Sequence, residues 1–147
     1  MSHRLLKKCR KELIEALVLR ERRDTLEGSL LPRALRYSHD QIRGMPEDHF
    51  TQAMADIADI STEINRKIIQ MAKRQHRAQR IVDALEDERY RMVLTLYYLT
   101  LKEERRGSHT AKSMYTWDEV AEAMNYSYDH VRRLHWEAIA AIENMTR

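Results

Sequence analysis

Apolar residues recur every three or four positions along most of this 147-residue chain, and charged or polar residues lie between them. This spacing is typical of amphipathic α-helices, whose apolar stripe faces a core. Glycine and proline, which interrupt helices, are rare, with three glycines and two prolines in all. Most of them fall between residues 28 and 46. The pattern therefore predicts an all-α fold divided into three helical blocks.

The first block, from about Ser2 to Leu26, is predicted to be one amphipathic helix. Its apolar face comprises Leu6, Cys9, Leu13, Ala16 and Leu17. We expect Gly28 to end this helix, as glycine commonly does. The stretch from Gly28 to Phe50 is predicted to be a connection, with a turn at Gly44-Met45-Pro46. Two interpretations of this connection are open: a functional loop or a simple tether.

The second block, from about Thr51 to Leu85, has the heptad spacing of a coiled coil. The seam comprises Ile57, Ser61, Ile64, Ile68, Met71, Gln75, Ala78, Val82 and Leu85. A helix of ~35 residues would be ~50 Å long, and the first helix is shorter than the seam it would cover. We therefore predict a homo-oligomer, a dimer or higher, in which residues 1–85 form a helical hairpin and oligomerisation region. The contacts between protomers are assigned to Ile57, Ile64, Ile68, Met71 and Val82.

This second helix also has a run of cations with no acid between Glu63 and Asp83. The cations are Arg66, Lys67, Lys73, Arg74, Arg77 and Arg80. Two interpretations are open. The run is a strip that faces DNA phosphates, or it is a solvated outer face with acids from another helix nearby.

The third block, residues 86–147, is predicted to be a helix-turn-helix domain. A support helix starts at Asp87, and a basic loop follows from about Lys102 to Tyr115. The first helix of the motif has an apolar stripe at Trp117, Val120, Ala121 and Met124. After a polar break at Asn125 and Tyr126, Ser127 is expected to cap a second helix. The buried stripe of that helix would be Val131, Leu134, Ala138 and Ile142.

In a helix-turn-helix the second helix places its N-terminal turns in the major groove of DNA. The candidate base contacts face away from the buried stripe and are Tyr128, Asp129, His130, Arg132 and Arg133. The candidate contacts to the DNA backbone are Ser127, Arg105, Arg106 and Lys112. Residues 116–147 contain six acids and three arginines, so the isolated motif should bind DNA poorly. Its phosphate contacts would have to come from elsewhere in the assembly.

Composition and charge narrow the function classes. The net charge is +3 and the isoelectric point about 9.1, which permits binding to nucleic acid. Cys9 is the one cysteine, so no internal disulfide can form, and a reducing cytoplasm is expected. No apolar run approaches the ~20 residues of a membrane span, and no secretory signal is expected. The seven histidines lack metal-ligand spacing and the glycines form no phosphate loop. We expect no metal, no cofactor and no enzymatic activity.

The C-terminal motif resembles the fourth conserved region of sigma factors. The matching positions are Thr116, Asp118, Glu119, Val120, Ala121, Ser127, Val131, Arg132, Ala138 and Ile142. In that family the promoter-contacting positions correspond to Tyr128, Asp129, His130, Arg132 and Arg133 of this chain.

Most of the chain resembles a narrower family, the RinA/ArpU-like late-gene activators of phages and prophages. The matching pieces are Tyr37-Ser38, Gly44-Met45-Pro46, Leu85-Glu86-Asp87 with Tyr90, and Tyr126-Ser127 with Val131. The loop between Leu101 and Thr116 is longer than is usual in the family. The resemblance implies activation of late transcription without the promoter-melting domain of a complete sigma factor.

Three functions are therefore open. The first is a sequence-specific regulator that binds double-stranded DNA, with the host RNA polymerase as a further candidate partner. The second is a DNA-recognition subunit of a packaging machine, similar to a small terminase. The third is a sigma-like protein-interaction module that does not bind DNA.

Overall fold

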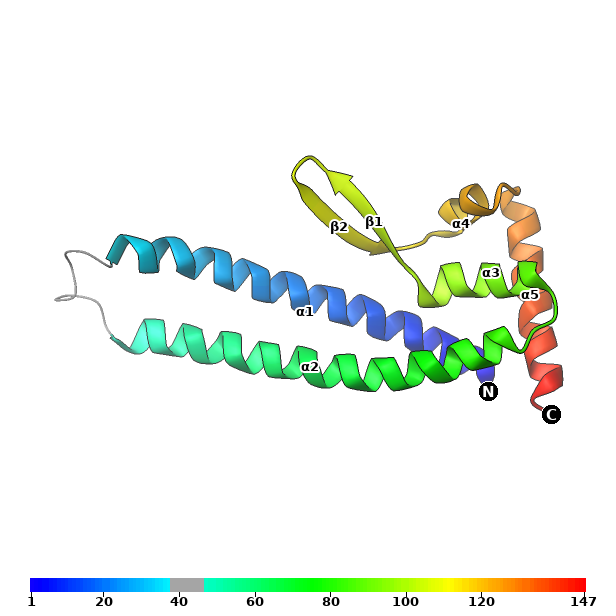
Figure 1. The fold of residues 1–147 in the computed structure, drawn as a ribbon, viewed down its shortest axis with the longest axis horizontal. Coiled ribbons are helices and arrows are strands. Elements are labelled where there is room, and N and C mark those ends of the chain that lie inside the picture. The colour runs from blue at the N-terminus through cyan, green and yellow to red at the C-terminus, as the bar shows by residue number, and fades with distance from the viewer. Residues whose placement is uncertain (38–46) are drawn as a thin grey trace. The chain divides into compact units, whose positions relative to one another are not determined.

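The computed structural model describes residues 1–37 and 47–147, with the side chains of residues 1–28 and 51–147. The described part is mainly helical and has one two-stranded sheet (Figure 1). The elements in chain order are the helices α1 (Ser2–Tyr37), α2 (Glu47–Asp83) and α3 (Glu88–Leu94), the π-helical segment η1 (Thr95–Leu99), the strands β1 (Leu101–Arg106) and β2 (His109–Met114), and the helices α4 (Trp117–Met124) and α5 (Tyr128–Met145). The mainly helical fold was predicted, whereas the sheet was not. None of the described helices has the length and apolar character needed to cross a membrane.

The chain divides into two compact units. Unit 1 contains residues 1–14 and 70–147, and unit 2 contains residues 15–69. Both long helices belong partly to each unit. The division therefore falls inside α1 and α2, and not at the predicted boundary between residues 85 and 86.

The prediction that Gly28 ends the first helix is wrong. α1 continues through Gly28 and Pro32 to Tyr37, and α2 begins at Glu47. A glycine inside a helix costs only about 1 kcal/mol relative to alanine, which packing can offset. The predicted connection of residues 28–50 is therefore helical at both ends. Its Gly44-Met45-Pro46 turn lies outside the described residues.

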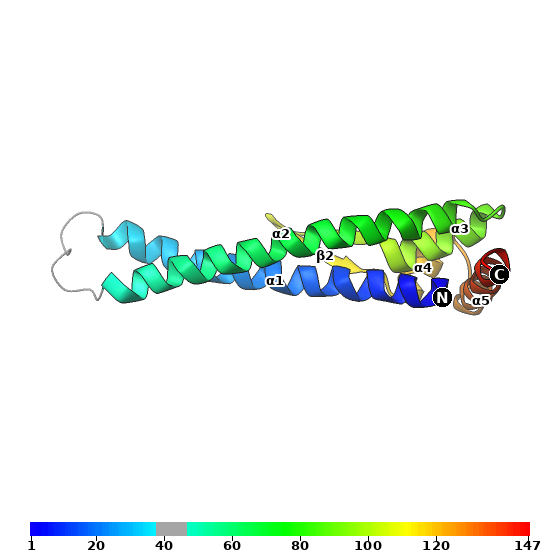
Figure 2. The same cartoon turned by 90° about the horizontal axis from the view of Figure 1, so that it is seen from below.

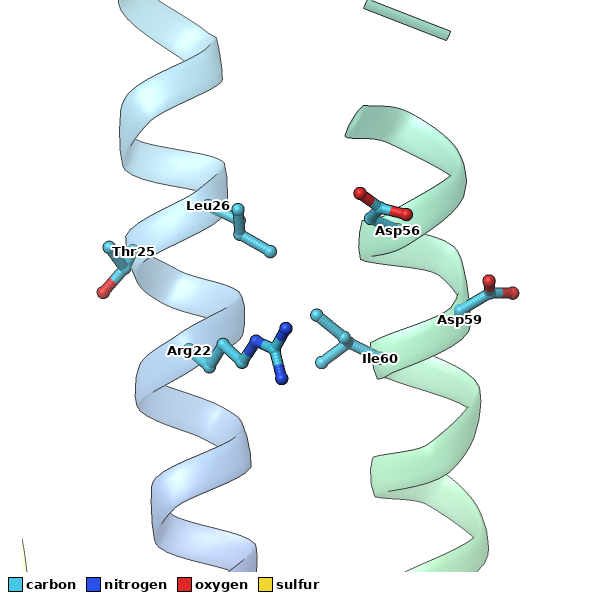
Figure 3. Close-up of a pocket in the computed structure, with 6 residues that line it drawn as sticks. All are labelled: Arg22, Thr25, Leu26, Asp56, Asp59 and Ile60. Atoms are coloured by element: carbon cyan, nitrogen blue, oxygen red, sulfur yellow. The ribbon is translucent and has the colours of Figure 1, made fainter. Parts of the chain in front are cut away.

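In unit 2 the two helices run side by side in opposite directions (Figures 1 and 2). Ile60 and Ile64 are its buried apolar residues among the side chains described. Lys67 of α2 forms an ion pair with Glu15 of α1 at 3.2 Å. A pocket also lies between the helices, lined by Arg22, Thr25, Leu26, Asp56, Asp59 and Ile60 (Figure 3).

Unit 1 contains the main hydrophobic core. The fully buried residues come from α1, α2, α3, α4 and α5, so the two ends of the chain meet in one core. The largest of them are Leu6, Leu94, Ile142, Val82, Val93, Val120, Val131 and Cys9. Asp87 caps α3, because its carboxylate accepts the Arg89 N–H at 2.8 Å. The predicted start of the third block at Asp87 is confirmed.

Two of the residues assigned to oligomerisation are already buried within the chain. Val82 is fully buried in the core of unit 1, and Ile64 is 5% exposed in unit 2. Their assignment to contacts between protomers is wrong, because α1 is nearly as long as α2 and supplies the cover that a second chain was expected to give. Ile57 and Met71 are half-buried, and Ile68 is 40% exposed. Only Ile68 among the five has an exposed side chain.

The segment predicted to be a basic loop is a β-hairpin, called here the β-ribbon. β1 pairs with β2 in antiparallel register from Leu101↔Met114 to Arg106↔His109. Gly107 and Ser108 form the two-residue connection, and Gly107 has φ 65°. Positive φ at such a connection is required by the twist of the strands and is readily adopted by glycine.

Candidate nucleic-acid interface

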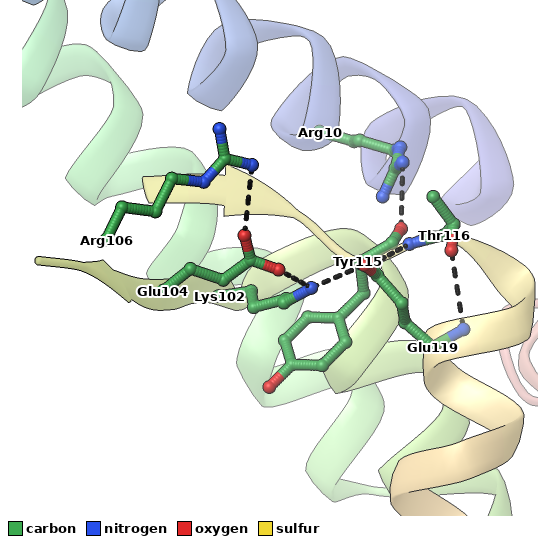
Figure 4. Close-up of polar contacts among 7 residues, drawn as sticks. All are labelled: Arg10, Lys102, Glu104, Arg106, Tyr115, Thr116 and Glu119. Carbon is green, nitrogen blue, oxygen red and sulfur yellow. Dashed lines mark hydrogen bonds and ion pairs between the residues drawn. The ribbon is translucent and has the colours of Figure 1, made fainter. Parts of the chain in front are cut away.

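The start of α4 is determined by a reciprocal cap. The Thr116 side chain accepts the Glu119 N–H at 3.3 Å, and the Glu119 carboxylate accepts the Thr116 N–H at 2.9 Å. Asp118 and Glu119 lie in the first turn, where negative charge is favoured by the helix dipole. Glu119 also forms an ion pair with Lys102 of β1 (Figure 4). One side chain therefore determines where α4 starts and joins it to the β-ribbon.

Three residues connect α4 to α5. Asn125 is left-handed at φ 56°, a conformation that asparagine tolerates better than most residues. The Tyr126 N–H donates to the Ala121 carbonyl at 3.0 Å, which is the bond of a Schellman helix end. Ser127 then caps α5 by accepting the His130 N–H at 3.3 Å. The predicted break and cap are confirmed, and the Ser127 oxygen assigned to DNA backbone contact already accepts this hydrogen bond.

The predicted buried stripe of α5 is confirmed. Val131, Leu134, Ala138 and Ile142 are all buried. On the opposite face of the first two turns, Tyr128 is 46% exposed, and Asp129 and Arg133 are also exposed. Three of the five predicted base contacts thus lie on an open surface at the capped end of α5.

The other two predicted base contacts are engaged within the chain. The Arg132 guanidinium lies over the Trp117 ring, 4.6 Å from its centroid. The His130 ring stacks on Tyr126, with centroids 4.5 Å apart and planes 21° apart. Sequence reasoning missed both contacts: the first joins α5 to α4, and the second joins α5 to the three-residue connection before it. Arg132 would have to leave Trp117 to contact a base.

The contact between Arg132 and Trp117 belongs to a longer series of stacked groups. Trp117 stacks on Tyr97 of η1, with centroids 3.7 Å apart. The Arg10 guanidinium of α1 lies over the Tyr97 ring at 3.9 Å. Arg10 also donates to the Tyr97 carbonyl, and to the Tyr115 carbonyl at 3.0 Å. Arg10 therefore holds the residues that precede β1 and follow β2, which the sequence did not indicate.

The three cations of the β-ribbon that were predicted to contact the DNA backbone differ in exposure and in ion pairing. Lys112 forms an ion pair with Glu103 across the strands at 3.1 Å. Arg106 pairs with Glu104 at 3.3 Å but keeps 76% of its side chain exposed. Arg105 is exposed and forms no ion pair among the described residues. Arg105 and Arg106 are thus more open to a phosphate than Lys112.

The base of the β-ribbon is joined to α4 by Lys102, a residue that the sequence analysis did not single out. Its ammonium contacts both Glu104 and Glu119 (Figure 4). The hydrogen bonds that the Lys102 ammonium donates to Glu104 and Glu119 raise the pKa of Lys102, and the same contact lowers the pKa of Glu119. The cation and its partners stay ionised around neutral pH.

The cations of the basic strip of α2 lie in different environments. Arg74 pairs with Glu12 and Lys67 with Glu15, both acids of α1. Arg77 and Arg80 line a cleft that also contains Met145, at the C-terminal end of α5. Since α5 has 18 residues, its two ends are about 27 Å apart. This cleft therefore lies at the opposite end of α5 from Tyr128 and Asp129.

A buried polar series lies behind the exposed face of α5. The Tyr98 hydroxyl is hydrogen-bonded to His135 Nε2 at 2.8 Å and to His3 Nε2 at 3.2 Å. Burial raises the pKa of Tyr98 to about 12 and lowers the pKa of His135 to about 4. His135 Nδ1 is buried and has no partner. Protonating His135 would therefore place a positive charge, and an Nδ1–H that has no acceptor, in a buried environment.

Acidification should destabilise unit 1 through His135. The pKa of His135 is about 4 in the folded chain and ~6.5 when unfolded, so the unfolded chain takes up the proton first as the pH falls. The stability present above pH ~6.5 is lost as the pH falls towards 4. Between pH 7 and 5 the free energy of unfolding should fall by ~2 kcal/mol through this group. Urea unfolding of the parent and of His135→Gln at both pH values measures it, and equal losses in the two proteins would contradict it.

The described residues contain no cluster of histidine, cysteine and acidic side chains that could hold a metal ion. What the α4–α5 surface offers is a set of hydrogen-bonding side chains on a capped helix, with arginines on a neighbouring ribbon. No family model matches the chain, and no curated protein or solved structure does either.

Proposed function

We propose that α4 and α5 form a helix-turn-helix and that the protein is a sequence-specific regulator of transcription that binds double-stranded DNA. The observation that carries the proposal is the first two turns of α5. They begin at a cap, expose Tyr128, Asp129 and Arg133, and pack their other face on a core. Such a helix can enter a major groove without uncovering apolar surface. The sigma-like pattern supports a role in late-gene activation in a phage or prophage.

The distribution of charge indicates that the α4–α5 motif and the β-ribbon contact different parts of the DNA. Residues 116–147 have six acids and three arginines, so α4 and α5 repel the DNA backbone. The β-ribbon, residues 101–114, has four Lys and Arg against two Glu, a net charge of +2. We assign base contacts to α5 and phosphate contacts to Arg105 and Arg106, as counterion release favours binding by exposed cations.

Unit 2 is the proposed oligomerisation surface. Its described side chains include four exposed apolar residues: Val18 at 59%, Met54 at 49%, Ile68 at 40% and Ile69 at 59% exposed. Exposed apolar groups of this size favour association with another apolar surface. A dimer would offer two α5 helices to repeated half-sites. Mass measurement in solution tests this, and a ring of about eight or more chains would favour a packaging subunit.

Removing Arg133 should weaken specific binding while leaving the fold intact. Duplexes selected from random sequence by the parent protein supply the binding site. Arg133→Ala should bind the selected duplex ~5- to 150-fold more weakly, because a bidentate arginine–guanine contact is worth ~1–3 kcal/mol. Fluorescence anisotropy at fixed salt measures the affinity.

The control for this experiment is Arg147→Ala. Arg147 is an exposed arginine two residues beyond the C-terminal end of α5, so the control removes the same charge at a distance from the proposed interface. Equal affinities of Arg133→Ala, Arg147→Ala and parent would remove Arg133 from the base contacts. If the parent selects no sequence and retains no duplex at low salt, the DNA-binding proposal fails.

A protein-interaction module is the second candidate function, because one large side chain is exposed without a role in DNA contact. Trp136 lies on α5 beyond the proposed base contacts and is 54% exposed. Tryptophan is enriched at the centres of protein interfaces. If Trp136→Ala loses binding to RNA polymerase but keeps its affinity for the duplex, the protein has the protein-interaction role in addition to DNA binding.

A further inference from the structure

The β-ribbon has no apolar face that would explain its presence. From Arg105 to Ser113 every residue is exposed. A two-stranded ribbon that buries no surface is barely stable alone in water. Its conformation must therefore come from its attachments, and its exposed end is free to contact another molecule.

The charge of the β-ribbon changes along its length. Glu103 pairs with Lys112, and Glu104, just past the middle of β1, pairs with Lys102 towards the base and with Arg106 at the tip. The stretch from Arg105 to Met114 contains no acid. The tip therefore presents Arg105, Arg106 and His109 around a connection of two small residues. The pairing of Arg106 with Glu104 is largely exposed, so a nucleic-acid contact can replace it at little cost.

The attachments hold this tip at a defined place relative to α5. Lys102 joins β1 to Glu119 in the first turn of α4, and Arg10 donates to the Tyr115 carbonyl after the ribbon (Figure 4). Arg10 also donates to the Tyr97 carbonyl before the ribbon. α4 in turn packs against α5 in the core of unit 1. Figure 1 shows that the ribbon starts next to α4 and that its tip extends away from α5.

The reach of the ribbon matches the spacing of DNA grooves. A strand of six residues is ~20 Å long. The major groove and the next minor groove are separated by about half of the ~34 Å helical repeat, or ~17 Å. A ribbon of this length can therefore span the distance from one groove to the next. Minor grooves rich in A·T pairs are narrow, and their negative potential attracts arginine.

We propose that the tip of the β-ribbon enters the minor groove beside the α5 site and places Arg105 and Arg106 in it, which gives the protein a preference for A·T pairs flanking its core site. This inference rests on the proposed function of α5. It assigns the ribbon a share in sequence specificity, beyond the phosphate contacts assigned to it above.

The test compares duplexes that differ only in the flank of the selected core site. One flank has A·T pairs, one has G·C pairs, and one has inosine·cytosine pairs, which resemble A·T in the minor groove and G·C in the major groove. The parent should bind the A·T and inosine·cytosine duplexes equally, and both about fivefold or more tightly than the G·C duplex. The Arg105→Ala/Arg106→Ala variant should keep its preference for the core and lose its preference for the flank.

The matched control is Arg4→Ala/Lys8→Ala, which removes the same charge from two exposed side chains of α1 in unit 1. It should keep the preference for the flank. The inference is overturned if the parent selects a core site but shows no preference for the flank. If the affinity of the ribbon variant then also depends less steeply on salt than that of the parent, the ribbon contacts phosphates only. A parent that selects no core site would instead overturn the proposed function of α5.

Discussion

Replacing Leu94 with alanine should lower the free energy of unfolding of unit 1 by about 2–5 kcal/mol. Leu94 ends α3, is fully buried and lies in the cluster that includes Val131 and Ile142 of α5. Removing its side chain leaves a cavity beneath the helix that we assign to base contact. Urea unfolding followed by tryptophan fluorescence measures the loss, because Trp117 and Trp136 both belong to unit 1.

The control for Leu94 lies two residues earlier on the same helix. Met92 is 46% exposed, so Met92→Ala should change the free energy of unfolding by no more than about 0.5 kcal/mol. A loss of less than about 1 kcal/mol in Leu94→Ala would contradict the core described here, because truncating a leucine that is buried on all sides costs more free energy than that.

Replacing Arg10 with methionine should cost about 2–3 kcal/mol of stability. The variant keeps most of the aliphatic side chain but removes the hydrogen bonds to the Tyr97 and Tyr115 carbonyls. A hydrogen bond from a charged donor is worth ~1.5–3 kcal/mol, and the carbonyls would lose their partner. Arg10→Lys should recover little, because an ammonium lacks the planar group that stacks on Tyr97 and reaches both oxygens.

Arg4 supplies the matched control for Arg10 because it is an exposed arginine on the same helix. Arg4→Met should leave the free energy of unfolding unchanged within about 0.5 kcal/mol. The Arg10 variants should also weaken the preference for the A·T flank while they keep the preference for the core site. Full stability in Arg10→Met would show that the β-ribbon is held in place without it.

Local patterns predicted the end of the chain well. Ser127 caps α5, and the break at Asn125 and Tyr126 falls where the polar residues indicated. Val131 and Ile142 are buried at the helical spacing that the sequence shows. These features depend on residues within one or two turns of each other, so the sequence contains most of the information that determines them.

The β-ribbon was missed although a local signal was present. Gly107-Ser108 is a dipeptide that suits a two-residue connection between strands. The flanking strands, however, are charged and lack the alternation of apolar and polar residues that normally indicates a strand. Contacts distant in sequence, from Arg10 and from Glu119, stabilise the ribbon instead.

By itself, the sequence determined the mainly helical fold, the start of α3 at Asp87, the cap of α5, and the apolar stripe on which α5 packs. These depend on short-range periodicity and on hydrogen bonds between neighbours in the chain. Only the tertiary structure decided that Val82 is buried by its own chain, that Arg132 lies over Trp117, and that Arg10 holds the β-ribbon. Each of these contacts joins residues far apart in sequence. The energy of such a contact depends on where the other elements pack, and no local pattern contains that information.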